Sequence, residues 1–158
     1  MHYTELDTPA LIVDLDVLER NLTTLQSACD RLEIDLRVHT KTHKTPRLAQ
    51  LQIDHGAVGI CSQKLGEAEV MVAGGIKDIL IPYNIVGAAK LKRLSRLIRE
   101  SDATLTLAAD SATVVAGLSR QATQDGLTIR VLVEMDSGMG RCGTQSPQQT
   151  LELAQEID

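Results

Sequence analysis

Aromatic residues are almost missing from this chain. It has no Phe and no Trp, and only Tyr3 and Tyr83 represent the class. Proteins that bind single-stranded nucleic acid stack the bases on aromatic side chains, so this function is disfavoured. The formal net charge of −5 also argues against a general binder of phosphate backbones. We therefore expect no nucleic-acid partner and a core built from Leu, Ile, Val and Ala.

Cysteines are few, and long apolar runs are absent. Cys29, Cys61 and Cys142 are odd in number and lack CxxC spacing, which is typical of a reducing compartment without a disulfide framework. The N-terminal stretch MHYTELDTPALIVDLD has no basic start, long apolar core or cleavage site, and no run reaches membrane-spanning length. We expect a cytoplasmic protein with no membrane partner.

Strand-like and helix-like patterns alternate along the chain. We expect strands at residues 10–15, 35–40, 57–62, 78–83, 104–109 and 128–135, with amphipathic helices between them. This alternation indicates right-handed βαβ units and a parallel sheet. By length alone, a doubly wound sheet is favoured over an eight-stranded (β/α) barrel, which needs about 250 residues. No linker or low-complexity tract divides the 158 residues, so we expect one domain.

Several expected helices carry boundary signals. Asp16 and Glu19 form a capping-box-like pair at the first helix. Thr45 and Pro46 fit the N-cap and first positions of the second. Gly74-Gly75 and Gly126 are expected to end two later helices.

The stretch RVHTKTHKTP, residues 37–46, concentrates cations behind an expected strand. Strand alternation places Arg37, His39 and Lys41 on one face, whereas buried parallel strands are usually apolar on both faces. The polar face predicts a barrel interior or crevice, with Lys41 at the carboxyl end, where such folds carry their chemistry. Two hypotheses remain. Nearby cations and partial desolvation favour a neutral, nucleophilic Lys41 suited to a Schiff base, and a solvated anion-binding loop explains the same pattern.

A second candidate motif is VLVEMDSGMGRCG, residues 131–143. Glu134 and Asp136 point the same way near the end of an expected strand, and a glycine-rich turn then presents Arg141. Carboxylates beside an arginine would orient its guanidinium toward an oxygen-bearing ligand. A structural ion pair in a loop is the alternative.

Other candidates are weaker. Gln63 lies at the expected barrel mouth, but capping of the next helix is the preferred explanation. His39 and His43 are candidates for polarising a cofactor pocket, or for bonding to backbone. As a metal pair they are poor, because HxxxH spacing suits a helix and here spans a strand end. Cys61 and Cys142 are interpreted as packing residues.

Four segments together resemble a known family in order and spacing: LDTPALIVDLDVLERN, RVHTKTHKTP, GICSQKLGEAEVMVAGGI and EMDSGMGRCG. They are similar to the D-threonine aldolase/D-serine dehydratase-like proteins, which are fold-type III pyridoxal phosphate (PLP) enzymes, as is alanine racemase. The resemblance implies that Lys41 carries PLP as a Schiff base and that Arg141 approaches the phenolic oxygen of the cofactor. His39 and Gln63 complete the expected cofactor site. Glu134 occupies a position that is typically a carbamylated lysine in alanine racemases. We infer that a glutamate supplies a comparable negative charge without modification.

The resemblance favours an incomplete barrel of the alanine racemase N-terminal type. Strands near residues 37, 59, 80, 106 and 132 supply five of eight barrel strands. Residues 1–158 are thus expected to be a partial PLP-binding (β/α) barrel domain without the C-terminal β-domain. In the family the missing parts carry the phosphate cup and the divalent-metal ligands, so we assign no metal ligand here. Unpaired barrel edges favour a homo-oligomer or other association.

The activity implied is that of a PLP-dependent lyase acting on small β-hydroxy D-amino acids. Aldolase and dehydratase chemistry both remain open, with D-threonine or 3-hydroxy-amino-acid aldolase slightly preferred. We interpret the chain as a fragment of the full enzyme and do not expect these residues alone to catalyse the reaction. The alternative is a non-catalytic PLP-binding, or homeostasis, protein of the same barrel type.

Overall fold

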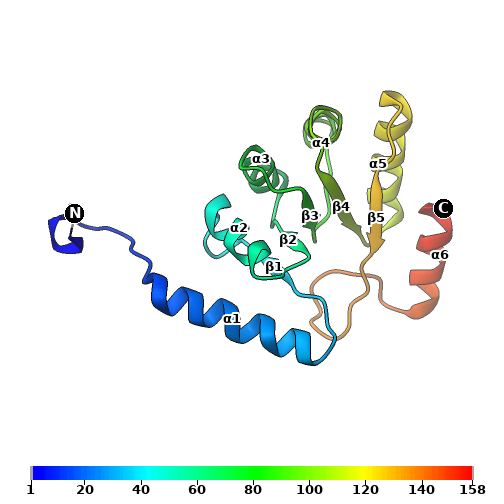
Figure 1. Cartoon of the computed structure of the whole chain (residues 1–158). Helices are drawn as coiled ribbons and strands as arrows, with labels where there is room; N and C mark the ends of the chain where they lie inside the picture. The colour runs from blue at the N-terminus through cyan, green and yellow to red at the C-terminus, as the bar shows by residue number, and fades with distance from the viewer. Residues whose placement is uncertain (1, 158) are drawn as a thin grey trace.

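Five parallel strands form one sheet with helices along one of its faces (Figure 1). The computed structural model describes residues 2–157. The strands are β1 (Arg37–His39), β2 (Gly59–Cys61), β3 (Asp78–Ile81), β4 (Thr104–Ala109) and β5 (Arg130–Val133). The helices that follow them in turn are α2 (Pro46–Asp54), α3 (Leu65–Ala73), α4 (Ala88–Glu100), α5 (Ala112–Asp125) and α6 (Pro147–Ile157).

The strand order identifies the architecture. The strands lie in the order β1-β2-β3-β4-β5, and every neighbouring pair is parallel. A doubly wound sheet reverses its order near the middle and places helices on both faces. Here each right-handed crossover moves one strand further in the same direction, so α2 to α6 follow one face in an arc (Figure 1). The expected partial (β/α) barrel, with five strands, is confirmed.

The core lies between the sheet and these helices. Along the register, Val38 pairs with Ile60, Ile60 with Ile79, and Ile79 with Leu105. All four side chains are buried. Burial of such a side chain stabilises the fold by about 1.5–3 kcal/mol. The predicted signals at Thr45-Pro46, Gly74 and Gly126 also mark helix ends as expected.

The other face of the sheet is polar and partly open. Arg37 donates to Asp78 at 2.8 Å across β2, and Gly59 lies beneath this ion pair. A Cβ atom at Gly59 would lie 2.9 Å from the backbone O of Asp78 and would also displace the Arg37 guanidinium, so a glycine is favoured there. This face is also uncovered at β5, where the Leu132 side chain is 53% exposed. The predicted division of the first barrel strand into an apolar and a polar face is therefore confirmed.

The strand predicted at residues 10–15 is wrong. This segment is extended but pairs with no strand among residues 2–157, and Leu11 is 99% exposed. Helix α1 (Leu15–Arg31) begins within it and projects away from the sheet (Figure 1). Its N-cap is Asp14, which accepts from the backbone N–H of Val17 at 3.0 Å, so the expected Asp16 cap is also wrong.

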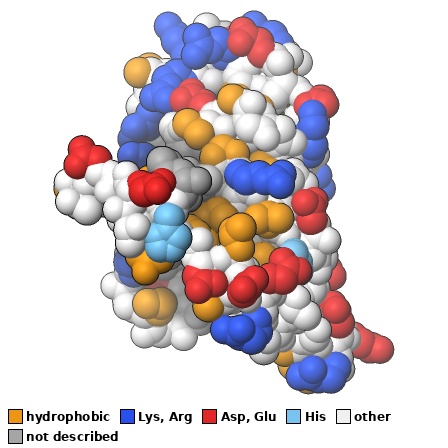
Figure 2. All heavy atoms as spheres, turned by 60° about the vertical axis from the view of Figure 1, so that its left-hand side comes forward, with side chains coloured by type: hydrophobic (Ala, Val, Ile, Leu, Met, Phe, Trp, Pro, Cys, Tyr) orange, Lys and Arg blue, Asp and Glu red, His pale blue; other side chains and the backbone are white. Residues whose placement is uncertain are grey.

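Apolar side chains at this end of the molecule lie open to solvent among charged ones (Figure 2). They include Leu11, Ile12, Val13 and Leu15. The contact between Glu19 Oε1 and His55 Nε2, at 2.9 Å, joins α1 to the end of α2. None of the helices in residues 2–157 is long and apolar enough to cross a membrane.

Candidate functional site

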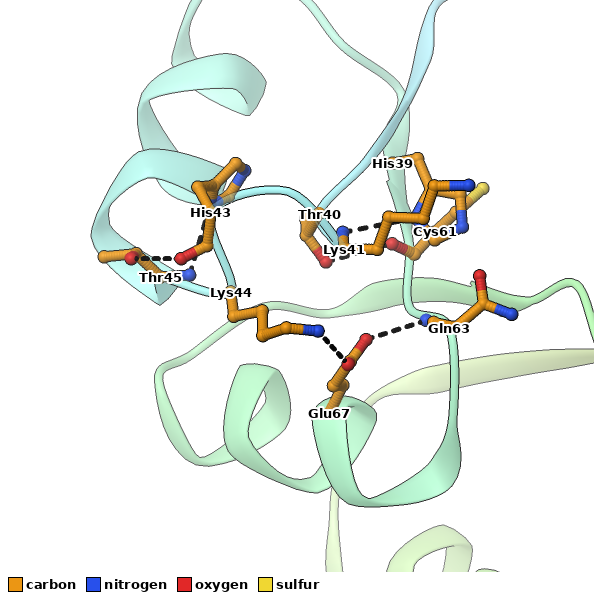
Figure 3. Close-up of polar contacts among 9 residues, drawn as sticks. All are labelled: His39, Thr40, Lys41, His43, Lys44, Thr45, Cys61, Gln63 and Glu67. Atoms are coloured by element: carbon orange, nitrogen blue, oxygen red, sulfur yellow. Dashed lines mark hydrogen bonds and ion pairs between the residues drawn. The ribbon is translucent and has the colours of Figure 1, made fainter.

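The candidate site begins with the turn after β1, residues 40–45, which we call the lysine loop. The N–H and hydroxyl of Thr40 both donate to the Cys61 carbonyl, at 2.9 and 3.0 Å, and so attach the loop to the end of β2. The Lys44 N–H donates to the Thr40 carbonyl at 2.8 Å and closes the turn. These bonds place Lys41 at the carboxyl edge of the sheet (Figure 3).

Lys41 presents an unengaged amine. Its backbone N–H donates to His39 Nδ1 at 3.3 Å, but its ammonium group has no hydrogen bond or ion pair within residues 2–157. The side chain is exposed, so the expected desolvation is wrong for this chain. The reason is that no described element covers the polar face of the sheet. An accessible lysine without competing partners can attack a carbonyl compound once its ammonium group has lost a proton.

His39 lies next to Lys41 as a neutral acceptor. Burial, and then the charge of Lys41, lower the pKa of His39 below 6.5, against a hydrogen bond with Gln63 that raises it. Because Nδ1 accepts from the Lys41 N–H, the neutral ring carries its proton on Nε2. The structure thus brings His39, Lys41 and Gln63 together (Figure 3).

Gln63 follows β2, and its role differs from the capping role considered above. Lys64, not Gln63, is the N-cap of α3. The backbone N–H of Gln63 donates to Glu67 Oε2 at 3.0 Å. Glu67 also accepts from Lys44 Nζ at 2.6 Å through its other oxygen. Sequence reasoning missed Glu67, although it lies one helical turn before the buried Met71 and thus on an inward face of α3.

The second motif forms a loop, residues 136–144, which we call the arginine loop. Asp136 Oδ1 accepts from the backbone N–H groups of residues 138–140 at 2.9–3.1 Å, and these bonds lower the pKa of Asp136. Glu134 Oε1 accepts from the Cys142 thiol at 3.1 Å. Arg141 is exposed and forms no ion pair with any carboxylate in residues 2–157. The expectation that Glu134 and Asp136 orient Arg141 is therefore wrong. Oδ1 of Asp136 is taken by backbone N–H groups, and neither carboxylate forms an ion pair with Arg141 in the described residues.

The two motifs lie at opposite ends of the strand order. The lysine loop follows β1 and the arginine loop follows β5, both at the carboxyl edge of the sheet. No contact joins Lys41 to Arg141 in the described residues. The structure brings three of the four predicted site residues together and leaves Arg141 apart.

Neither Cys61 nor Cys142 has the environment of a nucleophile. Burial raises the pKa of the Cys61 thiol, and the hydrogen bond to Glu134 raises that of Cys142. Both therefore remain protonated near neutral pH. No group of three His, Cys, Asp or Glu side chains suited to a metal ion occurs within residues 2–157.

Apart from Gln26 Oε1 on α1, the buried side-chain oxygens without a partner in residues 2–157 belong to residues that follow strands of the sheet. Ser62 Oγ, Asn84 Oδ1 and Glu134 Oε2 are buried and have no hydrogen-bond partner in the described part of the chain. They follow β2, β3 and β5, respectively. Buried polar atoms normally have partners, so their lack of one is consistent with a polar ligand at this edge. With the free amine of Lys41, these residues fit pyridoxal phosphate.

Comparisons with known proteins agree with this geometry. The family model for the alanine racemase N-terminal domain matches residues 13–158. D-threonine aldolase from Arthrobacter sp. is 44% identical over 150 residues, which cover 95% of this chain and 39% of that protein. 3-Hydroxy-D-aspartate aldolase from Paracoccus denitrificans is 39% identical over 155 residues, with 98% and 40% covered.

A solved structure shows the same arrangement. The crystal structure of D-threonine aldolase from Filomicrobium marinum matches with a TM-score of 0.93 at 40% identity, over 98% of this chain and 42% of that one. The chain thus spans about 40% of the length of the relatives that it matches.

Proposed function

Because the chain belongs to the alanine racemase N-terminal domain family, we propose that it is the cofactor-binding part of a PLP-dependent lyase. The observation that carries the proposal is the unengaged amine of Lys41 at the carboxyl end of β1, within the HTKTHK motif. The relatives named D-threonine aldolase and 3-hydroxy-D-aspartate aldolase support a small β-hydroxy D-amino acid as the substrate.

Each proposed site residue has a distinct task. Lys41 Nζ is the group that holds the cofactor, and Arg141 supplies a cation for its phenolic oxygen. His39 keeps a proton on Nε2 and so offers a hydrogen-bond donor beside Lys41, and the Gln63 side chain lies next to this ring (Figure 3). When bound, PLP withdraws electrons from the α-carbon of an amino acid. Glu134 keeps one buried carboxylate oxygen, Oε2, that has no hydrogen-bond partner within residues 2–157.

The reaction type and the surroundings of the site are part of the same proposal. Cleavage of the Cα–Cβ bond, as in an aldolase, is preferred to dehydration, although D-threo-3-hydroxyaspartate dehydratase from Delftia sp. is also 34% identical over 154 residues. A divalent metal would be held by residues outside this chain. The unpaired outer edges of β1 and β5 favour a homo-oligomer or pairing with further strands. We place the protein in the cytoplasm.

A chimera tests the lyase proposal. This chain replaces the segment of the Arthrobacter D-threonine aldolase that it matches, and the product receives PLP and Mg²⁺ or Mn²⁺. We expect D-threonine to yield glycine and acetaldehyde, L-threonine to be unreactive, and Lys41→Ala to abolish cleavage. A soluble chimera that binds PLP through Lys41 but turns over neither D-threonine nor D-serine would contradict a lyase. That result would favour the alternative, a non-catalytic PLP-binding protein.

A further inference from the structure

The lysine loop holds one residue in an unfavourable conformation. Lys44 has a φ of +51°, in the left-handed region that L residues other than Gly rarely adopt. Such conformations persist only where the surroundings fix them, and they are common at functional sites. The surroundings of Lys44 therefore indicate what keeps the loop in shape.

Glu67 of α3 provides the constraint. Its Oε1 accepts from Lys44 Nζ at 2.6 Å, and its Oε2 accepts from the Gln63 N–H at 3.0 Å. The Glu67 side chain is only 9% exposed, whereas that of Lys44 is 58% exposed. One buried carboxylate thus joins the turn after β1 to the turn after β2, one oxygen for each (Figure 3).

The charge state of Glu67 suits this task. Burial acts to raise the pKa of Glu67, but the hydrogen bonds from Lys44 and from the Gln63 backbone outweigh it, and the pKa is lowered overall. Glu67 is therefore ionised at neutral pH. Hydrogen bonds that involve an ionised group are shorter and stronger than neutral ones. The contact can thus offset the strain at Lys44.

We propose that Glu67 is a positioning residue for Lys41, acting through Lys44 and Gln63. Glu67 binds the turn after β1 through Lys44 and the turn after β2 through Gln63. It thereby holds the lysine loop closed and keeps Lys41 beside His39 and Gln63. The assignment to Lys41 depends on the proposed function, since it presumes that Lys41 holds PLP. The ordering of the loop does not depend on it and can be measured without cofactor.

A matched pair of variants separates positioning from general stability. Glu67→Gln keeps the size of the side chain and one acceptor but loses the charge that holds Lys44. Glu69→Gln is the control, because Glu69 lies on the same helix and also forms an ion pair, with Arg93. Both variants lose one ion pair of α3, but only the first loses the ion pair to the lysine loop.

The first readout is amide hydrogen exchange of the cofactor-free chain. We expect the Lys44 N–H, which donates to Thr40, to exchange about tenfold faster or more in Glu67→Gln, as for a lost hydrogen bond to a charged group. It should be unchanged in Glu69→Gln. Equal exchange in the two variants would overturn the proposal. Faster exchange throughout the sheet in Glu67→Gln would indicate a general loss of stability. In that case Lys44→Gln, which removes the same ion pair from its exposed side, must also speed exchange of the residue 44 N–H.

The second readout is the rate at which PLP labels Lys41 on borohydride reduction, relative to labelling of the exposed Lys90 in the same sample. We expect this ratio to fall in Glu67→Gln and to be unchanged in Glu69→Gln. If Glu67→Gln speeds exchange of the Lys44 N–H but leaves the labelling ratio unchanged, Glu67 does not position Lys41. Absence of Lys41 labelling in the unmodified chain would instead overturn the proposed function, while the exchange data still decide the ordering of the loop.

Discussion

Gly143 holds the arginine loop closed, and replacing it by Ala provides a quantitative test. Gly143 has a φ of +106°, and a Cβ atom there would collide with the backbone N of Asp136 and lie 2.6 Å from the backbone C of Met135. Backbone atoms cannot rotate away as a side chain does. In Gly143→Ala, the backbone around Asp136 and the backbone around Thr144 would therefore have to move apart.

The loss can be worked out from the contacts at this point. Separation breaks the bond from the Asp136 N–H to the Thr144 carbonyl, at 2.9 Å, and that from the Thr144 N–H to the Glu134 carbonyl, at 2.8 Å. Each contributes about 1 kcal/mol. Backbone strain adds about 1–3 kcal/mol. We expect Gly143→Ala to lower the free energy of unfolding by about 3–5 kcal/mol, the sum of these two contributions.

Gly138→Ala is the matched control. Gly138 lies in the same loop with a φ of +120°, but no atom lies within 4 Å of where its Cβ would stand. It therefore shares the strain without the collision. Urea denaturation of both variants should show Gly143→Ala less stable than Gly138→Ala by about 2 kcal/mol. A difference below about 0.5 kcal/mol would refute the reasoning, since ordinary surface substitutions vary by that much.

Two further predictions concern the sheet and α1. Leu107→Ala, at a fully buried position, should lower the free energy of unfolding by about 2–5 kcal/mol. Leu132→Ala, on the open face, should lower it by less than about 1 kcal/mol. Equal losses of unfolding free energy in urea denaturation would contradict a core on one side of the sheet. The hydrogen bond to the Leu51 carbonyl, and then Glu19, raise the pKa of His55 above 6.5, so its contribution to stability is complete below pH 6.5 and is lost as the pH rises through the raised pKa. An NMR titration should place the His55 midpoint above 6.5 and lower it in Glu19→Gln; a midpoint at or below 6.5 in the unmodified chain would contradict the contact.

The barrel strands and the position of Lys41 could be predicted because local patterns determine them. Alternation in residues 35–40 separates Val38 from His39 and Lys41, and the structure places these side chains on the two faces as expected. The strand order could not be obtained from the pattern, because a doubly wound sheet uses the same βαβ units. It required pairing information such as Val38 with Ile60, or the family resemblance.

The failures arise where the outcome depends on partners distant in sequence. Residues 10–15 have the composition of a strand, but no strand lies beside them in the described chain. Asp136 was expected beside Arg141, but the backbone N–H groups of a glycine-rich turn lie nearer and compete successfully. Glu67 was missed because its partners, Lys44 and Gln63, come together only when β1 and β2 pair.

The central claim is that Lys41 is the lysine that holds PLP. The most direct measurement mixes the purified chain with PLP, reduces the mixture with borohydride and maps the modified peptides by mass spectrometry. We expect one dominant label on Lys41, which is lost in Lys41→Ala and kept when the exposed Lys90 is replaced by Ala. Labels scattered over exposed lysines, or unchanged by Lys41→Ala, would contradict it.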